Sequence, residues 1–570
     1  MRLTRRELLK GSVVLSANAA LSGSTGSLAH AGRGSGSQLA NVNSQDRIFR
    51  GTICTLDDAN TVYLDGLLWI SGNTIRSVVP SIEALPAVAR KLPVIATEGV
   101  FYPGLIDLHK HMTYDIRGPW FAPRQYTNRT EFFFEPDYRR TVENPCRLLV
   151  QYAGMLDDVC LYSEIKALAG GTTALEGAAP WSRKYTSLLV RNIEFDNFGQ
   201  DRIHQTIWDV TVESAPPLRE LMPRLDAWIY HLSEGYGDYG QQRFSDLKQF
   251  QLLTNKLVAI HALGLNERQF AELAAAGASM VWSPLGNLRL YGRTADIAAA
   301  RRTGVNICLG SEWAPSGSKN VLFDLKVADQ FNQHRLNGLF ADRDLVEMVT
   351  RNAARAVGWK QRTGHLAPEM AADLLLLRKT HRDPYRNLID ATEQDVELVM
   401  VGGVPVYGGV NLMRRFDQTS MEILRPGRGS PKALAWNAAS PASDHPSYAS
   451  ITSRLSAALR MDSPTLLASL DRLQVRRALS STQPPVQQEY PFFLTIGDEP
   501  LTPEEVSQFL TKVFPEGVAP FDLDPVYLAD DPEALRVMQE PVLLQNGINL
   551  APYFESILPS TTSTRSGRSS

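Results

Sequence analysis

The sequence has few cysteines, no strong charge of either sign and no long apolar run. Its 570 residues include four cysteines, too few for a disulfide scaffold, and none stands in a Cys-x-x-Cys pair that would suggest a metal site. The formal net charge is −3, so the sequence offers no basic surface for nucleic acid or an anionic membrane. Beyond the N-terminus, no segment approaches the roughly 20 apolar residues that a membrane span requires. We therefore expect a small-molecule substrate, no nucleic-acid partner and no stable membrane insertion.

The first 31 residues are predicted to be an export signal and not part of the fold. Arg5-Arg6 precedes a short, mildly apolar run, and Ala29-His30-Ala31 has the small residues of a cleavage site. The pattern is similar to a twin-arginine signal, and an ordinary basic tail is the alternative. The prediction is a periplasmic or secreted protein in which residues 32–46 form a polar linker.

Two histidines at the end of an apolar strand are the first sign of a metal site. His109 and His111 follow Leu105-Ile106-Asp107-Leu108, and side chains at positions i and i+2 of a strand lie on one face. Neutral imidazoles are good ligands for zinc or iron. Two solvated histidines at a strand end would have the same spacing, so the pair alone leaves both interpretations open.

The residues around this pair resemble a known family. The run from Val100 through Pro103-Gly104 to His111 looks like the first barrel strand of the amidohydrolase superfamily of metal-dependent hydrolases. Residues 227–234, which end in His-x-x-Glu, are similar to the third-ligand strand of its deaminase and chlorohydrolase branch. Residues 257–263 then place His261 at a strand end, as the sixth strand of the family does. The resemblance thus extends over several strands in the expected order.

The resemblance implies a ligand set and two catalytic residues. The ligands of one divalent metal, zinc or iron, would include His109, His111 and His231. Glu234 would shuttle protons, and His261 would stabilise the attacking water. No lysine ends the strand predicted at 203–210, so the bridging carbamylated lysine of the two-metal branches is not evident. One metal is therefore favoured.

Glu312 departs from the pattern of the family. The family has an aspartate after its last barrel strand, where it binds the metal and accepts a proton from water, whereas here residues 305–310 are followed by Ser311-Glu312. Glutamate is longer by about 1.5 Å, and a misplacement near 1 Å can cost about 100-fold in rate. We expect Glu312 to serve as ligand and base with the backbone or the metal shifted to suit. A non-catalytic exported binding protein is the alternative.

The order of predicted elements indicates an α/β fold. Strands alternate with helical stretches over 99–364, the pattern of a TIM-like (β/α)8 barrel, with only two clear strands between His111 and His231, where a distortion is expected. The resemblance implies one β-sandwich built from residues 47–98 and 365–409. Residues 410–570 are predicted to be a helical extension with a disordered tail, and a capping box opens a helix at Thr502. Packing on the barrel, homo-oligomerisation and covering the pocket remain open as its role.

The predicted function is hydrolysis of a carbon–nitrogen bond other than a peptide bond. In the deaminase branch, water activated by the metal attacks an electron-poor carbon bonded to nitrogen, which implies a heterocyclic or amidine-like amine as substrate. Ring opening of a cyclic amide or imidazolone is a second enzymatic possibility. The aromatic-rich segment 117–138 is well placed to cover a flat substrate, although ordinary packing would have the same composition.

Overall fold

The structure is a computed structural model that describes residues 46–177, 189–195, 197–199, 202–416, 421–436, 446–468 and 502–554. The predicted export signal, all but the last residue of the predicted linker, and the tail from residue 555 lie outside these ranges. Within them, every helix is too short or too polar to cross a bilayer.

A nine-stranded sheet joins the two strand-rich segments on either side of the catalytic unit. Its order is β16-β17-β15-β14-β13-β4-β1-β2-β3. The strands are β1 (Arg47–Cys54), β2 (Val62–Ser71), β3 (Thr74–Val79), β4 (Val94–Pro103), β13 (Leu374–Leu377), β14 (Val396–Val401), β15 (Val404–Gly409), β16 (Met421–Leu424) and β17 (Lys432–Ala435). The two segments meet where β4 pairs antiparallel with β13. Strands of both segments therefore belong to one continuous sheet, as expected of a composite β unit.

Two boundaries of the predicted domains need correction. Val100 to Pro103 belongs to β4 of the large sheet, and the first strand of the catalytic unit starts only at Leu105. The extension is not purely helical, because β16 and β17 pair with each other and β17 pairs with β15. All four residues of β17 are buried, and its pairing with β15 and β16 rather than the low strand propensity of Ala and Lys accounts for this strand.

Short parallel strands form the catalytic unit. One sheet has the order β5-β6-β7 and the other β12-β11-β10-β9-β8. The strands are β5 (Leu105–Asp107), β6 (Thr172–Leu175), β7 (Arg191–Asn192), β8 (Ile203–Thr206), β9 (Ala227–Leu232), β10 (Leu257–His261), β11 (Ser279–Trp282) and β12 (Asn306–Leu309). An isolated parallel bridge between Lys110 and Glu312 joins the ends of β5 and β12. Among the described residues no ladder joins β7 to β8, so the pairing does not close a barrel there.

Helices cover these strands, and their ends carry clear sequence signals. They are α2 (Arg129–Phe132), α3 (Pro136–Tyr138), α4 (Asn144–Arg147), α5 (Leu156–Ala169), α6 (Ala215–Leu221), α7 (Asp238–Gln249), α8 (Glu267–Ala275), α9 (Pro284–Tyr291), α10 (Ile297–Thr303), α11 (Val321–Arg335), α12 (Asp342–Met348), α13 (Arg351–Ala356) and α14 (Pro384–Asp390). Asn266 and Gln269 form a capping box at the start of α8, and Gly304 ends α10 in the left-handed conformation. Strands β5, β6, β9, β10 and β11 are buried throughout, as expected for parallel strands covered on both faces.

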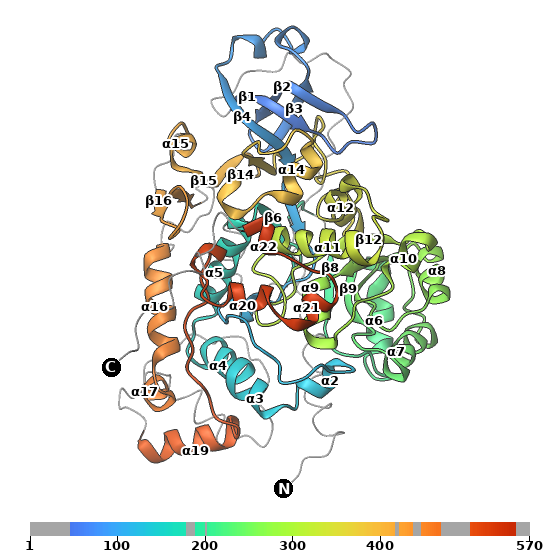
Figure 1. Cartoon of the computed structure of the whole chain (residues 1–570), viewed down its shortest axis with the longest axis vertical. Coiled ribbons are helices and arrows are strands. Elements are labelled where there is room, and N and C mark those ends of the chain that lie inside the picture. Colours follow the sequence, from blue (N-terminus) through green and yellow to red (C-terminus); the bar gives the residue numbers. More distant parts are fainter. Residues whose placement is uncertain are drawn as a thin grey trace, which may run out of the picture.

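The extension wraps around the catalytic unit. Its helices are α15 (Val410–Met413), α16 (Tyr448–Arg460), α17 (Ser463–Ala468), α19 (Pro503–Val513), α20 (Ala534–Met538), α21 (Pro541–Gln545) and α22 (Ala551–Phe554). The capping box predicted at Thr502 is confirmed, with Glu505 as its partner. Figure 1 shows α16, α17 and α19 along one edge of the molecule, while the chain then returns so that α21 packs beside α9.

Candidate active site

Three predicted ligands, His109, His111 and His231, converge on one point at the carboxyl ends of β5 and β9. The Nε2 atom of His109 lies 3.3 Å from that of His111 and 3.1 Å from that of His231, and the third distance is 3.3 Å. Three nitrogens bound to one ion at about 2.0–2.1 Å and tetrahedral angles would be about 3.3 Å apart. The histidine cluster therefore has the spacing of a metal tripod.

The protonation state of these three histidines also suits metal binding. Burial, together with the neighbouring histidines, lowers the pKa of His109 and His231 well below the ordinary value of 6.5. The pKa of His111 is lowered to about 3 for the same reasons. The Nδ1 atom of His109 lies 2.7 Å from the Oγ of Ser283, so that Nδ1 can carry the proton while Nε2 presents its lone pair. The imidazoles are thus neutral, as ligands must be.

His261 and Glu234 lie beside this cluster and face each other. The Nε2 of His261 is 3.6 Å from the Oε1 of Glu234, and its Nδ1 is 2.9 Å from the Oδ1 of Asn287. The amide nitrogen of Asn287 donates to Thr294 at 3.2 Å, so its oxygen is the atom available to accept from His261. Nε2 is therefore the free nitrogen and points toward the carboxylate of Glu234.

Glu234 is held by two residues that the sequence did not single out. The hydroxyl of Tyr291 donates to Oε1 at 2.6 Å, and Nη1 of Arg129 lies 3.4 Å from Oε2. Burial, followed by the charge of Glu234, raises the pKa of Tyr291 well above its ordinary value, so the tyrosine remains a donor. Ser283, Asn287 and Tyr291 recur every four residues, and this helical spacing is the signal that could have indicated a shared face toward the site.

Glu312 reaches the site but has a different environment. Ligand atoms of Glu234, His261 and Glu312 lie within 4.8 Å of one another, and all three residues are buried. The Oε2 atom of Glu312 has no hydrogen-bond partner among the described residues. Burial, then the charges of Glu234 and Asp324, raise the pKa of Glu312 well above its ordinary value. Its carboxylate packs against Gly286, where a Cβ would collide with it.

The backbone at these strand ends is strained. Non-glycine residues have positive φ at Ser233 (52°), His261 (67°), Ala262 (51°) and Glu312 (61°). Such conformations cost about 1–3 kcal/mol each and persist where surrounding structure fixes them. The backbone amide of Glu312 donates to the carbonyl of His109 at 2.7 Å, which is one such constraint.

Aromatic side chains border the histidine cluster. Trp313 lies edge-on to His111, with ring centroids 6.1 Å apart, and is edge-on to Tyr114 at 5.1 Å. Phe132 and Tyr138, from the predicted aromatic segment, pack within 6.2 Å of Trp313. Phe134 of the same segment is 56% exposed and lies outside this cluster. Part of the aromatic segment therefore packs next to the site.

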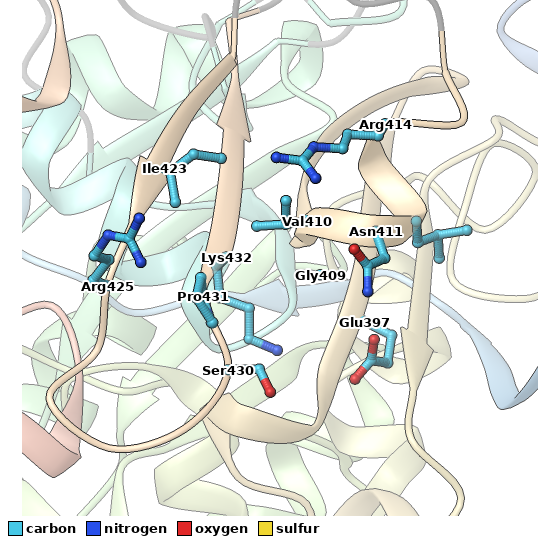
Figure 2. Close-up of a pocket in the computed structure, with 11 residues that line it drawn as sticks. Glu397, Gly409, Val410, Asn411, Arg414, Ile423, Arg425, Ser430, Pro431 and Lys432 are labelled. Carbon is cyan, nitrogen blue, oxygen red and sulfur yellow. The ribbon is translucent and has the colours of Figure 1, made fainter.

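A separate cleft lies at the far edge of the large sheet. It has a volume of about 410 Å³ and is lined by residues of β14, β15, α15, β16 and β17 and of the turns beside them, including Arg414, Arg425 and Lys432. Figure 2 shows these side chains, none of which was predicted to take part in catalysis. The cleft is therefore distinct from the candidate active site.

Short parallel strands with a histidine cluster at their carboxyl ends are the features to set beside known proteins. Residues 225–406 match the amidohydrolase family, which supports a place for this chain in the amidohydrolase superfamily. A 5-methylthioadenosine/S-adenosylhomocysteine deaminase of Pyrococcus abyssi is 29% identical over 175 residues, which are 29% of this chain and 41% of that protein. The enzyme of the same description from Caldicellulosiruptor saccharolyticus is 24% identical over 58% of this chain and 85% of its own length.

Solved structures give the fold. An adenosine deaminase from Xanthomonas campestris with bound zinc superposes with a TM-score of 0.53 at 19% identity, over 63% of this chain and 92% of that one. Such neighbours imply a TIM-like barrel arrangement for the parallel strands, although the described strands fall into separate sheets. The extension lies beyond the segment matched by the family.

Proposed function

We propose that this protein is a metal-dependent hydrolase of non-peptide carbon–nitrogen bonds that deaminates a heterocyclic or amidine-like amine. The main support is one arrangement: Glu234 and His261 face each other beside three histidines whose Nε2 atoms converge. A carboxylate next to a basic imidazole nitrogen can move protons between water and an amine. The relatives described above as deaminases support the same reaction type.

The residues present fit a divalent metal. Three neutral imidazoles, of which His109 and His231 are buried, present nitrogen lone pairs to one point, and the buried Oε2 of Glu312 lacks a hydrogen-bond partner among the described residues. We propose that His109, His111, His231 and Glu312 hold one zinc or iron ion. When bound, such an ion would lower the pKa of water toward about 7 and so supply a nucleophile at neutral pH.

The side chains of this chain would then perform the proton transfers. Glu234, whose Oε1 accepts from Tyr291, is placed to protonate the departing amine nitrogen. His261 would hold the attacking water through Nε2, because Asn287 takes up its other nitrogen. Trp313, edge-on to His111, offers an aromatic wall against which a flat heterocycle can pack. We therefore place the scissile carbon between Glu234 and the histidine cluster.

The test is ammonia release from a panel of purine nucleosides, triazines and amidines, measured with the full chain supplemented with zinc or iron. Release of ammonia from at least one amine, abolished by a chelator and restored by the ion, is the expected result. Opening of cyclic amides or imidazolones without ammonia release would replace deamination with the ring-opening reaction. No turnover of any compound by fully metallated protein would favour a binding protein.

We also propose that the protein is exported, on the basis of Arg5-Arg6 and the Ala29-His30-Ala31 step alone. Fractionation of the cells that produce it, with Arg5 and Arg6 both changed to Lys as the comparison, tests this. Retention of both forms in the cytoplasm would contradict the proposal.

A further inference from the structure

Helix α9 and its N-cap contact four of the six side chains of the proposed site through one face. Ser283, at its N-cap, meets His109 at 2.7 Å, and Asn287 meets His261 at 2.9 Å. Tyr291, at its end, donates to Glu234 at 2.6 Å. Gly286 lies against the carboxylate of Glu312. A shift of this eight-residue helix would therefore move the partners of a ligand, a base and a water-holding histidine together.

Arg289 of α9 is held by the C-terminal extension. Its side chain is 3% exposed, and the guanidinium makes a forked contact with Glu540, with Nε at 3.0 Å from both oxygens and Nη2 at 2.8 Å from Oε1. The remaining donors reach the carbonyls of Pro315 and Trp120, both at 3.0 Å. A buried cation without its carboxylate is costly, so Glu540 fixes the position of this charge.

The same guanidinium thus joins four parts of the molecule. Pro315 belongs to the loop after β12 that carries Glu312, and Trp120 belongs to the aromatic segment. The ring of Phe121 has both guanidinium groups near it, that of Arg289 at 5.6 Å from the ring centre and that of Arg536 of α20 at 3.6 Å. The extension therefore reaches α9, the loop after β12 and the aromatic segment at one junction.

The extension also contacts the loop after β12 through buried ion pairs. Asp524 forms buried ion pairs with Lys319 of that loop and with Lys166 of α5, each at 2.7 Å. Asp531 lies 2.9 Å from Lys319 as well. Lys110, between His109 and His111, donates to the carbonyl of Ser318 at 2.9 Å in the same loop. Two acidic groups of the extension thus fix the loop that follows Glu312.

We propose that residues 502–554 are a working part of the active site, in which Glu540 is a positioning residue that holds α9 against the metal ligands and Glu234. The proposal goes beyond the deaminase function, although its kinetic test rests on that function. It assigns a role to a part of the chain that lies outside the segment matched by the family.

The experiment compares Glu540→Gln with Glu533→Gln in the full-length, metal-loaded protein. Glu533 is the matched control, because it pairs at 3.3 Å with Arg536 in the same segment but both side chains are largely exposed, 43% and 63%. We expect Glu540→Gln to lower kcat about tenfold with KM within about threefold, and to speed metal loss to a chelator about tenfold. Glu533→Gln should match the wild type in all three quantities.

A merely structural role for Glu540 would lower the melting temperature and leave kcat and the metal-release rate within twofold of the wild type, and this result would overturn the proposal. Glu540→Asp keeps the charge and serves if Glu540→Gln does not fold; we then expect kcat to fall twofold to fivefold and metal loss to accelerate. If Glu540→Gln does not fold and Glu540→Asp has the kcat and the metal-release rate of the wild type, Glu540 serves folding alone and the proposal is wrong. If the wild type turns over no amine, the deaminase proposal fails, whereas metal release still decides the role of Glu540.

Discussion

The loops after β9 and β12 each bring a buried glutamate to the same site, but they hold it differently. Glu234 receives a hydrogen bond from Tyr291 and lies beside Arg129. Glu312 has an oxygen without a partner in the described part of the chain. Side chains of the protein satisfy the first carboxylate, whereas the second keeps an unpartnered oxygen, which we propose as a ligand for the metal ion. In the proposed function, the loop after β9 thus serves proton transfer and the loop after β12 serves metal binding.

The largest expected effect comes from removing the ion on which this comparison depends. His109→Ala should leave the protein without bound metal and reduce turnover to background, because two imidazoles hold zinc or iron far less tightly than three. Elemental analysis after dialysis measures this directly. His381→Ala, at an exposed position, is the control and should keep its metal. A full metal complement in His109→Ala would place the site elsewhere.

The next change addresses the loop after β9 alone. Glu234→Gln keeps the shape of the side chain and removes the proton carrier, so kcat should fall by about 100-fold or more while the metal content stays at the wild-type level. Steady-state kinetics and metal analysis of one preparation separate the two quantities. Unchanged turnover would remove Glu234 from the mechanism and weaken deamination as the reaction.

The corresponding change in the loop after β12 should have the opposite signature. Glu312→Ala is expected to weaken metal binding about 10- to 100-fold, because a ligand or a close neighbour of the ion is lost. Competition with a chromogenic chelator measures the affinity. Glu312→Asp sharpens the comparison: faster turnover than the wild type would mean that the natural glutamate is a detuned base. Metal affinity in Glu312→Ala equal to that of the wild type would end the ligand proposal.

The change with the smallest expected effect on turnover is Asp524→Asn, which should instead alter how stability depends on pH. Asp524 pairs with Lys319 of the loop after β12. Burial alone would raise the pKa of Asp524, but Lys166 and Lys319 hold it below the ordinary value of 3.8. Because the pKa of Asp524 is lower in the folded than in the unfolded protein, the charged carboxylate stabilises the fold at any pH above its unfolded-state pKa. This stabilisation is lost as the pH falls through the folded-state pKa, which lies below 3.8. Asp524→Asn should therefore be less stable than the wild type at pH 7, and the gap should narrow in acid.

Urea unfolding at several pH values measures this gap. Asp522→Asn is the matched control, because Asp522 pairs with Arg460 while both side chains are mostly exposed, 79% and 70%. Its stability should follow the wild type at every pH. A gap between Asp524→Asn and wild type that stays constant from pH 7 to pH 3 would contradict the argument.

The sequence indicated the site better than the scaffold around it. His109, His111, His231, Glu234 and His261 were singled out because each ends a strand or stands in a short motif, and the structure brings them together. The paired part of β7 is only two residues long, too short for any periodic pattern to indicate. The pairing of β17 with β15 depends on tertiary contacts that local propensity does not contain.

The residues that position the site were harder to find for a physical reason. Ser283, Asn287 and Tyr291 share a helix face, but nothing local says what that face meets. Arg289 and Glu540 are 251 positions apart, and one arginine among many charged residues has no pattern that points to its partner. Ion pairs between residues so far apart in the sequence can be identified only from the folded structure, which brings both side chains into one buried junction.

The separation of 251 positions between Arg289 and Glu540 also bears on how the protein is made. A chain emerging from the ribosome at about 5–20 residues per second presents His109, His231 and His261 well before it presents residue 540. Until then Arg289 lacks its carboxylate, and α9 has no contact with the extension. This support of the site therefore forms only after residue 540 has been made, so the histidines are complete as a set before their surroundings are.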